Sequence, residues 1–381
     1  MPHTSGLPRL FLSPPHMGGN EQHYIQAAFD ANYIAPLGAN VTDFEKRVAC
    51  YTQSPHAVAL SCGTAAIHLA LILLGVKAGD PVLASSFTFI GSVSPIIHLG
   101  AEPIFIDADT NSWNLDPALL EEALHDRQQR ALPMPRVLIL THLYGQPANV
   151  DALAAVCQRY GVTIIEDAAE SLGATWRGRH TGTLGTFGIL SFNGNKIITT
   201  SGGGMLLTPS AEYAKQALYL ATQARQNTPH YEHTDVGYNY RMSNIVAGIG
   251  CGQMEVLAER VARKRDIFTL YQTLLADIEC VHFMPELPHA CGNRWLTTIT
   301  VDHPAITPET LRLYLEAQNI ESRPLWKPMH LQPVFRGAQA YTQGVSEKLF
   351  ATGLCLPSGT AMSDSDIERV ATLVRHCIER V

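Results

Sequence analysis

The stretch HAVALSCGTAAIHLALILLG, residues 56–75, sets the expectation for the fold. Residues 56–61 form a short apolar run typical of a buried strand, and residues 64–75 are predicted to form a helix. The SCG tripeptide at 61–63 supplies the turn between them. A strand followed at once by a helix is the repeating unit of a mostly parallel sheet covered by helices, so the stretch predicts an α/β protein.

The same alternation continues to about residue 210. Residues 151–161 are predicted to form a helix that ends on a glycine, as helices often do. The expected further strands are 81–85, 102–107, 136–145, 162–167, 187–192 and 203–208. These elements together predict one large domain built on a mostly parallel sheet.

The pattern changes in the C-terminal third of the chain. Residues 254–278 repeat apolar side chains near helical spacing and are predicted to bridge to a second domain. A strand at 295–301, a helix at 307–318 capped by its threonine and a final helix at 363–381 follow. We therefore expect a large α/β domain over 1–255 and a smaller C-terminal α+β domain over 256–381.

Composition excludes several classes of protein. The 381 residues are 46% hydrophobic and 16% charged, which is typical of a globular enzyme, and a net charge of −7 without a basic block argues against nucleic-acid binding. Eight cysteines without a C-x-x-C pair indicate neither a zinc knuckle nor a disulfide framework, so a reduced, cytoplasmic setting is expected. No signal peptide, membrane-spanning run or metal-ligand cluster is evident, and we predict no catalytic metal.

Ligands in open α/β sheets bind outside the carboxyl ends of the strands, which directs attention to the residues that follow each strand. Gly63 and Thr64 come after the first strand, at the first turn of a helix, where free backbone N–H groups favour a phosphate. The alternative is an ordinary strand–turn–helix junction capped by Ser61 or Thr64. The residues alone leave both interpretations open.

A carboxylate, Asp167, ends the strongly apolar run VTIIED. Burying such a charge without a partner costs several kcal/mol, so a cation must meet it unless it caps a following helix. A protonated heterocyclic nitrogen is one such cation.

The stretch SFNGNKIITTSGGGM, residues 191–205, places a single lysine among small and amide residues. An amine whose surroundings favour its neutral form is a nucleophile towards an aldehyde, so Lys196 is a candidate for a Schiff base. Ser191 offers a hydroxyl to a phosphate, and Phe89 could cover a flat ring, although an aromatic residue after a strand is more often part of the core.

One cofactor fits these features better than others. Pyridoxal phosphate needs a Schiff-base lysine, an acid on its pyridine nitrogen and an anion site for its phosphate. A nicotinamide cofactor would need G-x-G-x-x-G after the first strand, and SCGTAAIH does not supply it.

The motifs resemble a known family. In chain order these are LSPPHMGG, SCGTAAIHLAL, SSFTFIGSVSPI, THLYGQP, EDAAESLGA, SFNGNKIITTSGGGM and GYNYRMSNIVAGIG. Over nearly the whole chain they look like the sugar-nucleotide aminotransferases of the DegT/DnrJ/EryC1/StrS group. Within that group, the motif SFNGNKIITTSGGGM together with ESRPLWKPMHLQPVF and CLPSGTAMS is similar to the bacterial enzymes that aminate UDP-4-keto-6-deoxy-N-acetylglucosamine, on the way to bacillosamine-type sugars for protein glycosylation.

The resemblance implies a fold and a cofactor site. The fold would be that of aspartate aminotransferase, fold type I of the pyridoxal phosphate enzymes. Lys196 would hold the cofactor, Glu170 would stand where many relatives carry glutamine near the ring oxygen, and Asn239 would reach the cofactor phosphate of the neighbouring subunit in a homodimer. Asp167 would pair with the ring nitrogen, Phe89 would stack on the ring, and the phosphate would be bound by Gly63, Thr64 and Ser191.

The resemblance also implies substrates: L-glutamate as amino donor and a nucleotide-linked keto sugar as acceptor. Candidate sugar contacts are Asn32, Tyr33 and Ile34, with Trp326 and His330 from the segment RPLWKPMH, which on its residues alone is equally well a solvated loop with a buried tryptophan. Alternatives are a dTDP-sugar aminotransferase and a non-enzymatic binding module. A related sugar dehydratase is disfavoured because those relatives replace the lysine by histidine.

Overall fold

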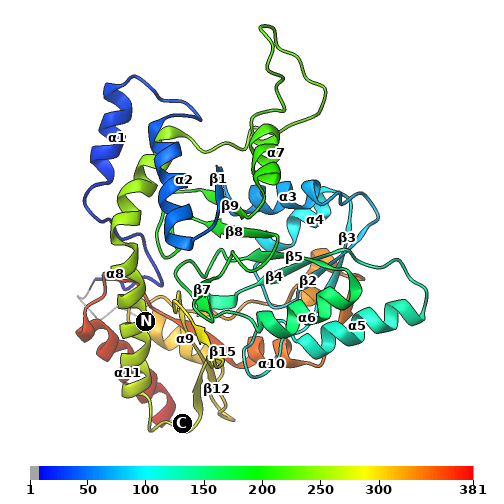
Figure 1. Cartoon of the computed structure of the whole chain (residues 1–381). Coiled ribbons are helices and arrows are strands. Elements are labelled where there is room, and N and C mark those ends of the chain that lie inside the picture. The colour runs from blue at the N-terminus through cyan, green and yellow to red at the C-terminus, as the bar shows by residue number, and fades with distance from the viewer. Residues whose placement is uncertain (1–7, 381) are drawn as a thin grey trace.

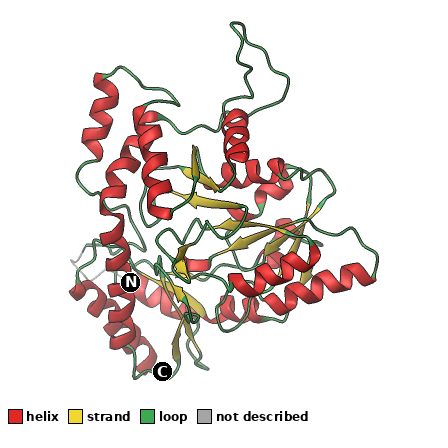
Figure 2. Ribbon diagram, viewed as in Figure 1, coloured by secondary structure: helices red, strands yellow, loops and turns green. Residues whose placement is uncertain are grey.

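The computed structural model describes residues 8–380, which form one large and two smaller β-sheets with helices packed around them (Figures 1 and 2). The strands of the large sheet are β1 (His56–Leu60), β2 (Pro81–Ser85), β3 (Glu102–Ile106), β4 (Val137–Thr141), β5 (Thr163–Asp167), β8 (Phe187–Ser191), β9 (Gly204–Thr208) and β14 (Gln339–Tyr341). The helices around it are α1 (Glu21–Asp30), α2 (Ala39–Thr52), α3 (Gly63–Leu73), α4 (Ser94–His98), α5 (Pro117–Gln129), α6 (Val150–Tyr160), α7 (Ala211–Ala221) and α8 (Asn244–Leu274).

The large sheet has the strand order β1-β9-β8-β5-β4-β2-β3-β14, and β9 is antiparallel to both of its neighbours. The pairings from β8 to β14 are all parallel. This arrangement confirms the expected α/β class and mostly parallel sheet. Its consequence is that β1, β2, β4, β5 and β8 end at one edge, where the residues that follow them meet.

Helices cover both faces of this sheet. The core on one face joins α3, α4 and α7 to the strands, with Leu69 and Phe105 fully buried. The core on the other face joins α5 and α6 to β2, β3, β4 and β5, with Leu120 and Leu138 fully buried. Because both faces are covered, the strands are apolar almost throughout, as in the fully buried β4 sequence VLILT.

The second sheet has the order β10-β12-β15-β13. Its strands are β10 (Val281–Phe283), β12 (Thr297–Val301), β13 (Arg323–Pro324) and β15 (Gly353–Leu356), and the neighbouring helices are α9 (Pro308–Glu316), α10 (Val345–Thr352) and α11 (Asp364–Glu379). Thr307 caps α9 as expected, through a hydrogen bond from Thr310 N. A third, three-stranded sheet pairs β11 (Ala290–Cys291) with β6 (Thr175–Trp176) and β7 (Arg179–His180).

The long helix α8 connects the part of the chain around the large sheet to the core of the small sheet. Its first half packs with α1 and α2, while Ile267 and Tyr271 in its second half belong to the core of the small sheet. It begins ten residues before the predicted start at 254, because its glycines conceal the helical pattern. At Gly250 a Cβ atom would lie 2.7 Å from the ring of Phe44, so the small residue is needed for close packing of α2.

The division of the chain at residue 255 stays a prediction. α8 is continuous across that residue, and β14 from the C-terminal part joins the large sheet. Within residues 8–380, no helix combines the length and apolar character needed to cross a membrane. The same residues contain no group of three or more His, Cys, Asp or Glu side chains placed to hold a metal ion.

Gly204 allows the start of β9 to pass directly beneath the turn between β1 and α3. A Cβ atom there would lie 2.3 Å from the carbonyl carbon of Cys62 and 2.5 Å from Gly63 N. Gly204→Ala should therefore lower the free energy of unfolding by about 1–3 kcal/mol, measured by urea denaturation. Gly202→Ala is the matched control, because a Cβ atom at that position would have open space within 4 Å. Equal stability of the two variants would contradict this account of the packing.

Candidate active site

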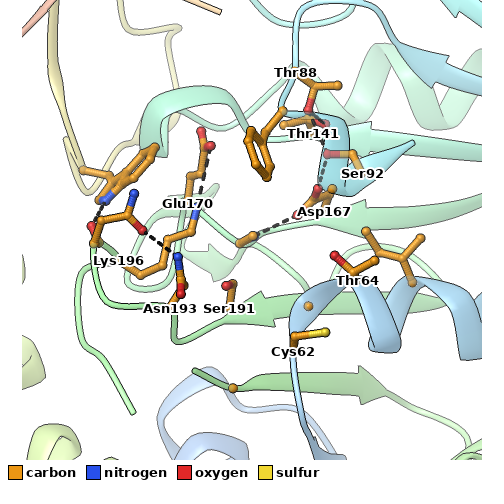
Figure 3. Close-up of a pocket in the computed structure, with 18 of the residues that line it drawn as sticks. Cys62, Thr64, Thr88, Ser92, Thr141, Asp167, Glu170, Ser191, Asn193 and Lys196 are labelled. Carbon is orange, nitrogen blue, oxygen red and sulfur yellow. Dashed lines mark hydrogen bonds and ion pairs between the residues drawn. The ribbon is translucent and has the colours of Figure 1, made fainter. Parts of the chain in front are cut away.

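A cavity of about 220 Å³ lies at the carboxyl edge of the large sheet, where β1, β5 and β8 end (Figure 3). It is lined by strand ends, by the loop that carries Lys196, and by two tryptophans from the C-terminal part of the chain. The predicted site residues that line it are Gly63, Thr64, Phe89, Asp167, Glu170, Ser191, Lys196 and Trp326. The topology thus brings together residues that are up to 263 positions apart, from Gly63 to Trp326.

The first turn of α3 faces this cavity with Gly63 and Thr64. The alternative in which Ser61 or Thr64 caps this helix is wrong in its choice of residue: Cys62 is the N-cap, and its Sγ accepts a hydrogen bond from Ala65 N at 3.4 Å. The remaining N–H groups of a first helical turn and the positive end of the helix dipole favour an anion. Ser191, at the end of β8, lines the cavity beside Gly63, so the region suits a phosphate.

Asp167 ends β5 and is only 6% exposed. Its Oδ2 accepts a hydrogen bond from Ser92 Oγ at 2.5 Å, and its Oδ1 accepts one from Ala169 N at 3.1 Å. The hydroxyl of Ser92 continues through Thr88 to Thr141, with oxygen–oxygen distances of 2.8 and 2.9 Å (Figure 3). This chain of hydroxyls fixes the carboxylate at the cavity wall.

No salt bridge joins Asp167 to a basic side chain in the described part of the chain. The alternative that it caps a helix is wrong, because residues 168–174 form turns. A buried carboxylate that faces a cavity and is supported by neutral donors is suited to a cationic group of a ligand. The residues present therefore fit pyridoxal phosphate, whose protonated ring nitrogen is such a group.

Lys196 extends into the cavity from the loop between β8 and β9, with its side chain 12% exposed. Its Nζ lies 3.7 Å from Glu170 Oε1 and 4.2 Å from the centroid of the Trp295 ring. The loop is held from behind, because Thr199 N donates to Gln253 Oε1 of α8 at 3.2 Å. The backbone that carries the Lys196 amine is therefore held in place by α8.

Glu170 is a buried carboxyl beside this amine. Burial raises its pKa, and the charge of Lys196 together with a hydrogen bond from Tyr144 N opposes that rise. The Tyr144 N–H donates to Glu170 Oε2 at 2.7 Å. Tyr144 has φ 51°, and this left-handed backbone turns its N–H towards the carboxyl.

Aromatic side chains form one wall of the cavity. Phe89, which is half exposed, contacts Trp326 with 5.3 Å between ring centroids. Trp326 stacks on Tyr144 at 5.9 Å and an interplanar angle of 13°, and its backbone N donates to the Tyr144 hydroxyl at 2.9 Å. A flat ligand entering the cavity would meet Phe89 and Trp326.

Other predicted residues lie outside the lining of this cavity. Asn239 is on an exposed segment between α7 and α8, where its Oδ1 accepts from Gln223 Nε2 at 3.0 Å. His330 is held between Ser86 Oγ at 2.6 Å and Glu347 Oε1 at 2.9 Å. Their predicted roles stay predictions.

The segment Asn32–Ile34 also lies outside this lining. It follows α1, and Tyr33 and Ile34 are 44% and 53% exposed. Tyr33 lines a separate hollow between α1 and the start of α8. Their predicted role as sugar contacts stays a prediction.

Several lining residues were not anticipated from the sequence. Thr141 ends β4, so the rule that selected Asp167 applies equally to it. Ser92 and Trp295 had no such signal, since a serine in a loop and a tryptophan before a strand are usually structural. Their importance comes from contacts with Asp167 and Lys196 that only the fold creates.

Comparison with known proteins identifies the family. The sequence profile described as "DegT/DnrJ/EryC1/StrS aminotransferase family" matches residues 15–375. The chain is 48% identical over 377 residues to the Bacillus subtilis (strain 168) protein named "Putative pyridoxal phosphate-dependent aminotransferase EpsN", covering 98% of this chain and 97% of that protein. It is 35% identical over 370 residues to a GDP-perosamine synthase of Caulobacter vibrioides, covering 96% and 97%.

Solved structures agree with this family assignment. A DegT DnrJ EryC1 StrS aminotransferase from Brucella abortus superimposes with a TM-score of 0.88 at 27% identity, covering 94% of this chain and 95% of that one. DesI, solved in the presence of its TDP-sugar product, gives a TM-score of 0.89 at 28% identity, covering 100% and 95%. The fold and site define a pyridoxal phosphate-dependent aminotransferase. The chain belongs to the DegT/DnrJ/EryC1/StrS aminotransferase family.

The raised pKa of Glu170 predicts a pH-dependent cost of burial. Below the pKa of the unfolded chain the carboxyl is protonated in both states, whereas at higher pH the folded protein resists its ionisation. The stability of Glu170→Gln relative to wild type should therefore rise from pH 4 to pH 7, measured by urea denaturation of the cofactor-free proteins. A difference that stays constant, or that falls, over this range would contradict the prediction.

Proposed function

We propose that this enzyme transfers an amino group from L-glutamate to C4 of a nucleotide-linked 4-keto-6-deoxy sugar. The specific acceptor that we propose is UDP-2-acetamido-2,6-dideoxy-4-keto-hexose. The product would be UDP-2-acetamido-4-amino-2,4,6-trideoxyglucose, in the formation of bacillosamine-type sugars for protein glycosylation. The observation that carries the proposal is the placement of Lys196 and the buried Asp167 carboxylate in one cavity with the start of α3.

Pyridoxal phosphate is the cofactor, and when bound it supplies a ring that accepts electrons from the reacting carbon. Lys196 would hold the cofactor and then move a proton at the substrate carbon, for which its position inside the cavity is suitable. Asp167 would accept a hydrogen bond from the ring nitrogen and keep it protonated. Gly63 and Ser191 would bind the phosphate, while Phe89 would cover one face of the ring.

A homodimer with composite active sites is part of the proposal. The segment between α7 and α8 projects from the body of the protein, at the top of Figure 1. It carries the exposed Asn239, which we assign to the cofactor phosphate of the neighbouring subunit. The exposed Tyr33 and Ile34 are likewise assigned to sugar contacts completed by a second subunit. Such contacts would explain why these residues lie away from the cavity of their own chain.

Three nucleotides are candidates for the carrier of the sugar. Resemblance of the segment ESRPLWKPMHLQPVF to bacillosamine-type enzymes supports a UDP-sugar. The GDP-perosamine synthase relative supports a GDP-sugar as the second candidate, and DesI with its TDP-sugar product keeps the dTDP-sugar alternative. We place the enzyme in the cytoplasm, in keeping with the eight cysteines, all of which are free in the structure.

Substrate selection is tested by incubating the enzyme with glutamate and a panel of UDP-, dTDP- and GDP-linked 4-keto-6-deoxy sugars. The expected result is preferred amination of the UDP sugar at C4, identified by mass spectrometry and NMR. Preference for a GDP or dTDP sugar would overturn the proposed substrate while leaving the aminotransferase assignment intact.

The role of Lys196 is tested by substitution. Lys196→Ala should lose the absorbance of the lysine–cofactor linkage and reduce turnover by roughly 10³-fold, because proton transfer by a positioned group is removed. Lys46→Ala, on the exposed face of α2, is the control and should retain both. Turnover of Lys196→Ala at the wild-type rate would eliminate the proposed mechanism.

A further inference from the structure

A second lysine lies beneath the active site, in the middle of α8. Lys264 is 2% exposed, and its Nζ donates hydrogen bonds to Trp295 O at 2.8 Å and to Ser13 Oγ at 3.0 Å. A lysine is almost never buried so completely unless it has a partner for its charge. Both partners of Lys264 are neutral oxygen atoms.

The two partners are connected to each other through the loop of Lys196. Ser13 Oγ donates to Asn195 O at 3.2 Å, and Trp295 Nε1 donates to the same carbonyl oxygen at 2.7 Å. The hydrogen bonds therefore close a circuit that runs from Lys264 through Ser13 and Asn195 to Trp295 and back. Asn195 directly precedes Lys196, and the Trp295 ring lies 4.2 Å from the Lys196 Nζ.

We infer that Lys264 is a positioning residue of the active site, which fixes Trp295 and the backbone of Asn195 so that Lys196 is presented to the cofactor. This inference rests on the proposed function of Lys196. The circuit joins four segments that are distant in sequence: the N-terminal segment, the β8–β9 loop, the segment just before β12, and α8. Removing Lys264 leaves Trp295 O and Ser13 Oγ without their shared donor, which opens the circuit that positions Trp295 and Asn195.

The surroundings of Lys264 favour its neutral amine. Burial lowers its pKa from the ordinary 10.5 to about 7. The other titratable groups that line the small cavity beside it are His16 and Lys196, and Arg260 lies one turn earlier on α8. None of the side chains lining this cavity is acidic. A neutral amine has two N–H groups, which match its two acceptors, and it adds no charge beside Lys196.

The lowered pKa has a defined consequence for stability. Between about pH 7 and 10.5 the unfolded chain binds a proton at Lys264 that the folded chain does not, so this residue makes stability rise with pH. Lys264→Met keeps most of the length of the side chain and removes both the donors and the titration. Relative to wild type, the urea midpoint of cofactor-free Lys264→Met should therefore gain less between pH 7 and pH 9.

The deciding experiment measures how fast Lys196 reacts with the cofactor. Cofactor-free protein is mixed with pyridoxal phosphate, quenched with borohydride at intervals, and digested, and the labelled lysine is identified by mass spectrometry. Lys264→Met should label Lys196 about tenfold more slowly than wild type, because the amine is less well oriented. Ser13→Ala, which removes one member of the circuit, should slow labelling in the same direction and keeps the test valid if Lys264→Met fails to fold.

Tyr271→Phe is the matched control, since Tyr271 is also fully buried on α8 and its hydroxyl donates to Pro357 O at 2.9 Å. It should lose stability without slowing the labelling of Lys196. Labelling at the wild-type rate in Lys264→Met and Ser13→Ala would overturn the positioning role. Absence of label at Lys196 in wild type would instead refute the proposed function, so the two failures are distinguishable.

Discussion

The buried carboxyl group of Asp167, at the end of the central strand β5, sets the main constraint on this structure. A carboxylate that is only 6% exposed costs several kcal/mol unless its surroundings replace water. Ser92 and the backbone of Ala169 supply that replacement in part, and both approach from segments that follow parallel strands. The side of the carboxylate towards the cavity is left for a ligand. The fold therefore creates one site, beside Asp167 in the cavity, that favours a cationic group of a ligand.

The amine opposite this carboxylate depends on a different part of the molecule. Lys196 belongs to a loop of the large sheet, but the groups around it come from elsewhere: Trp295 lies just before β12 of the small sheet, and Gln253 and Lys264 lie on α8. α8 packs against elements around the large sheet and against the core of the small sheet, so it fixes their position relative to each other. The carboxyl group of Asp167 is thus held by segments of the large sheet, whereas the amine of Lys196 is surrounded by groups from the junction between the large and small sheets.

Much of this arrangement could be predicted from the sequence, for identifiable reasons. Fully buried strands such as β2 and β5 read as continuous apolar runs, and the strand-end rule located Asp167 and Gly63. The strand predicted at 136–145 ended early at Thr141, because Tyr144 adopts a left-handed backbone that no apolar pattern reveals. Trp295 and Lys264 were missed since their roles arise from contacts between distant segments. The residue type alone does not reveal whether a lysine is buried or exposed to solvent.

The backbone of Tyr144 also restricts which side chains this position tolerates. A non-glycine residue at φ 51° is strained, so glycine would be more comfortable there on backbone grounds alone. Glycine, however, would remove both the ring that stacks on Trp326 and the hydroxyl that accepts a hydrogen bond from the backbone N–H of Trp326. Phenylalanine would keep the ring but leave that backbone N–H unpaired. The residue at position 144 must tolerate a left-handed backbone, supply a stacking ring and supply an accepting hydroxyl. Few substitutions meet all three requirements, so we expect family members to differ rarely at this position.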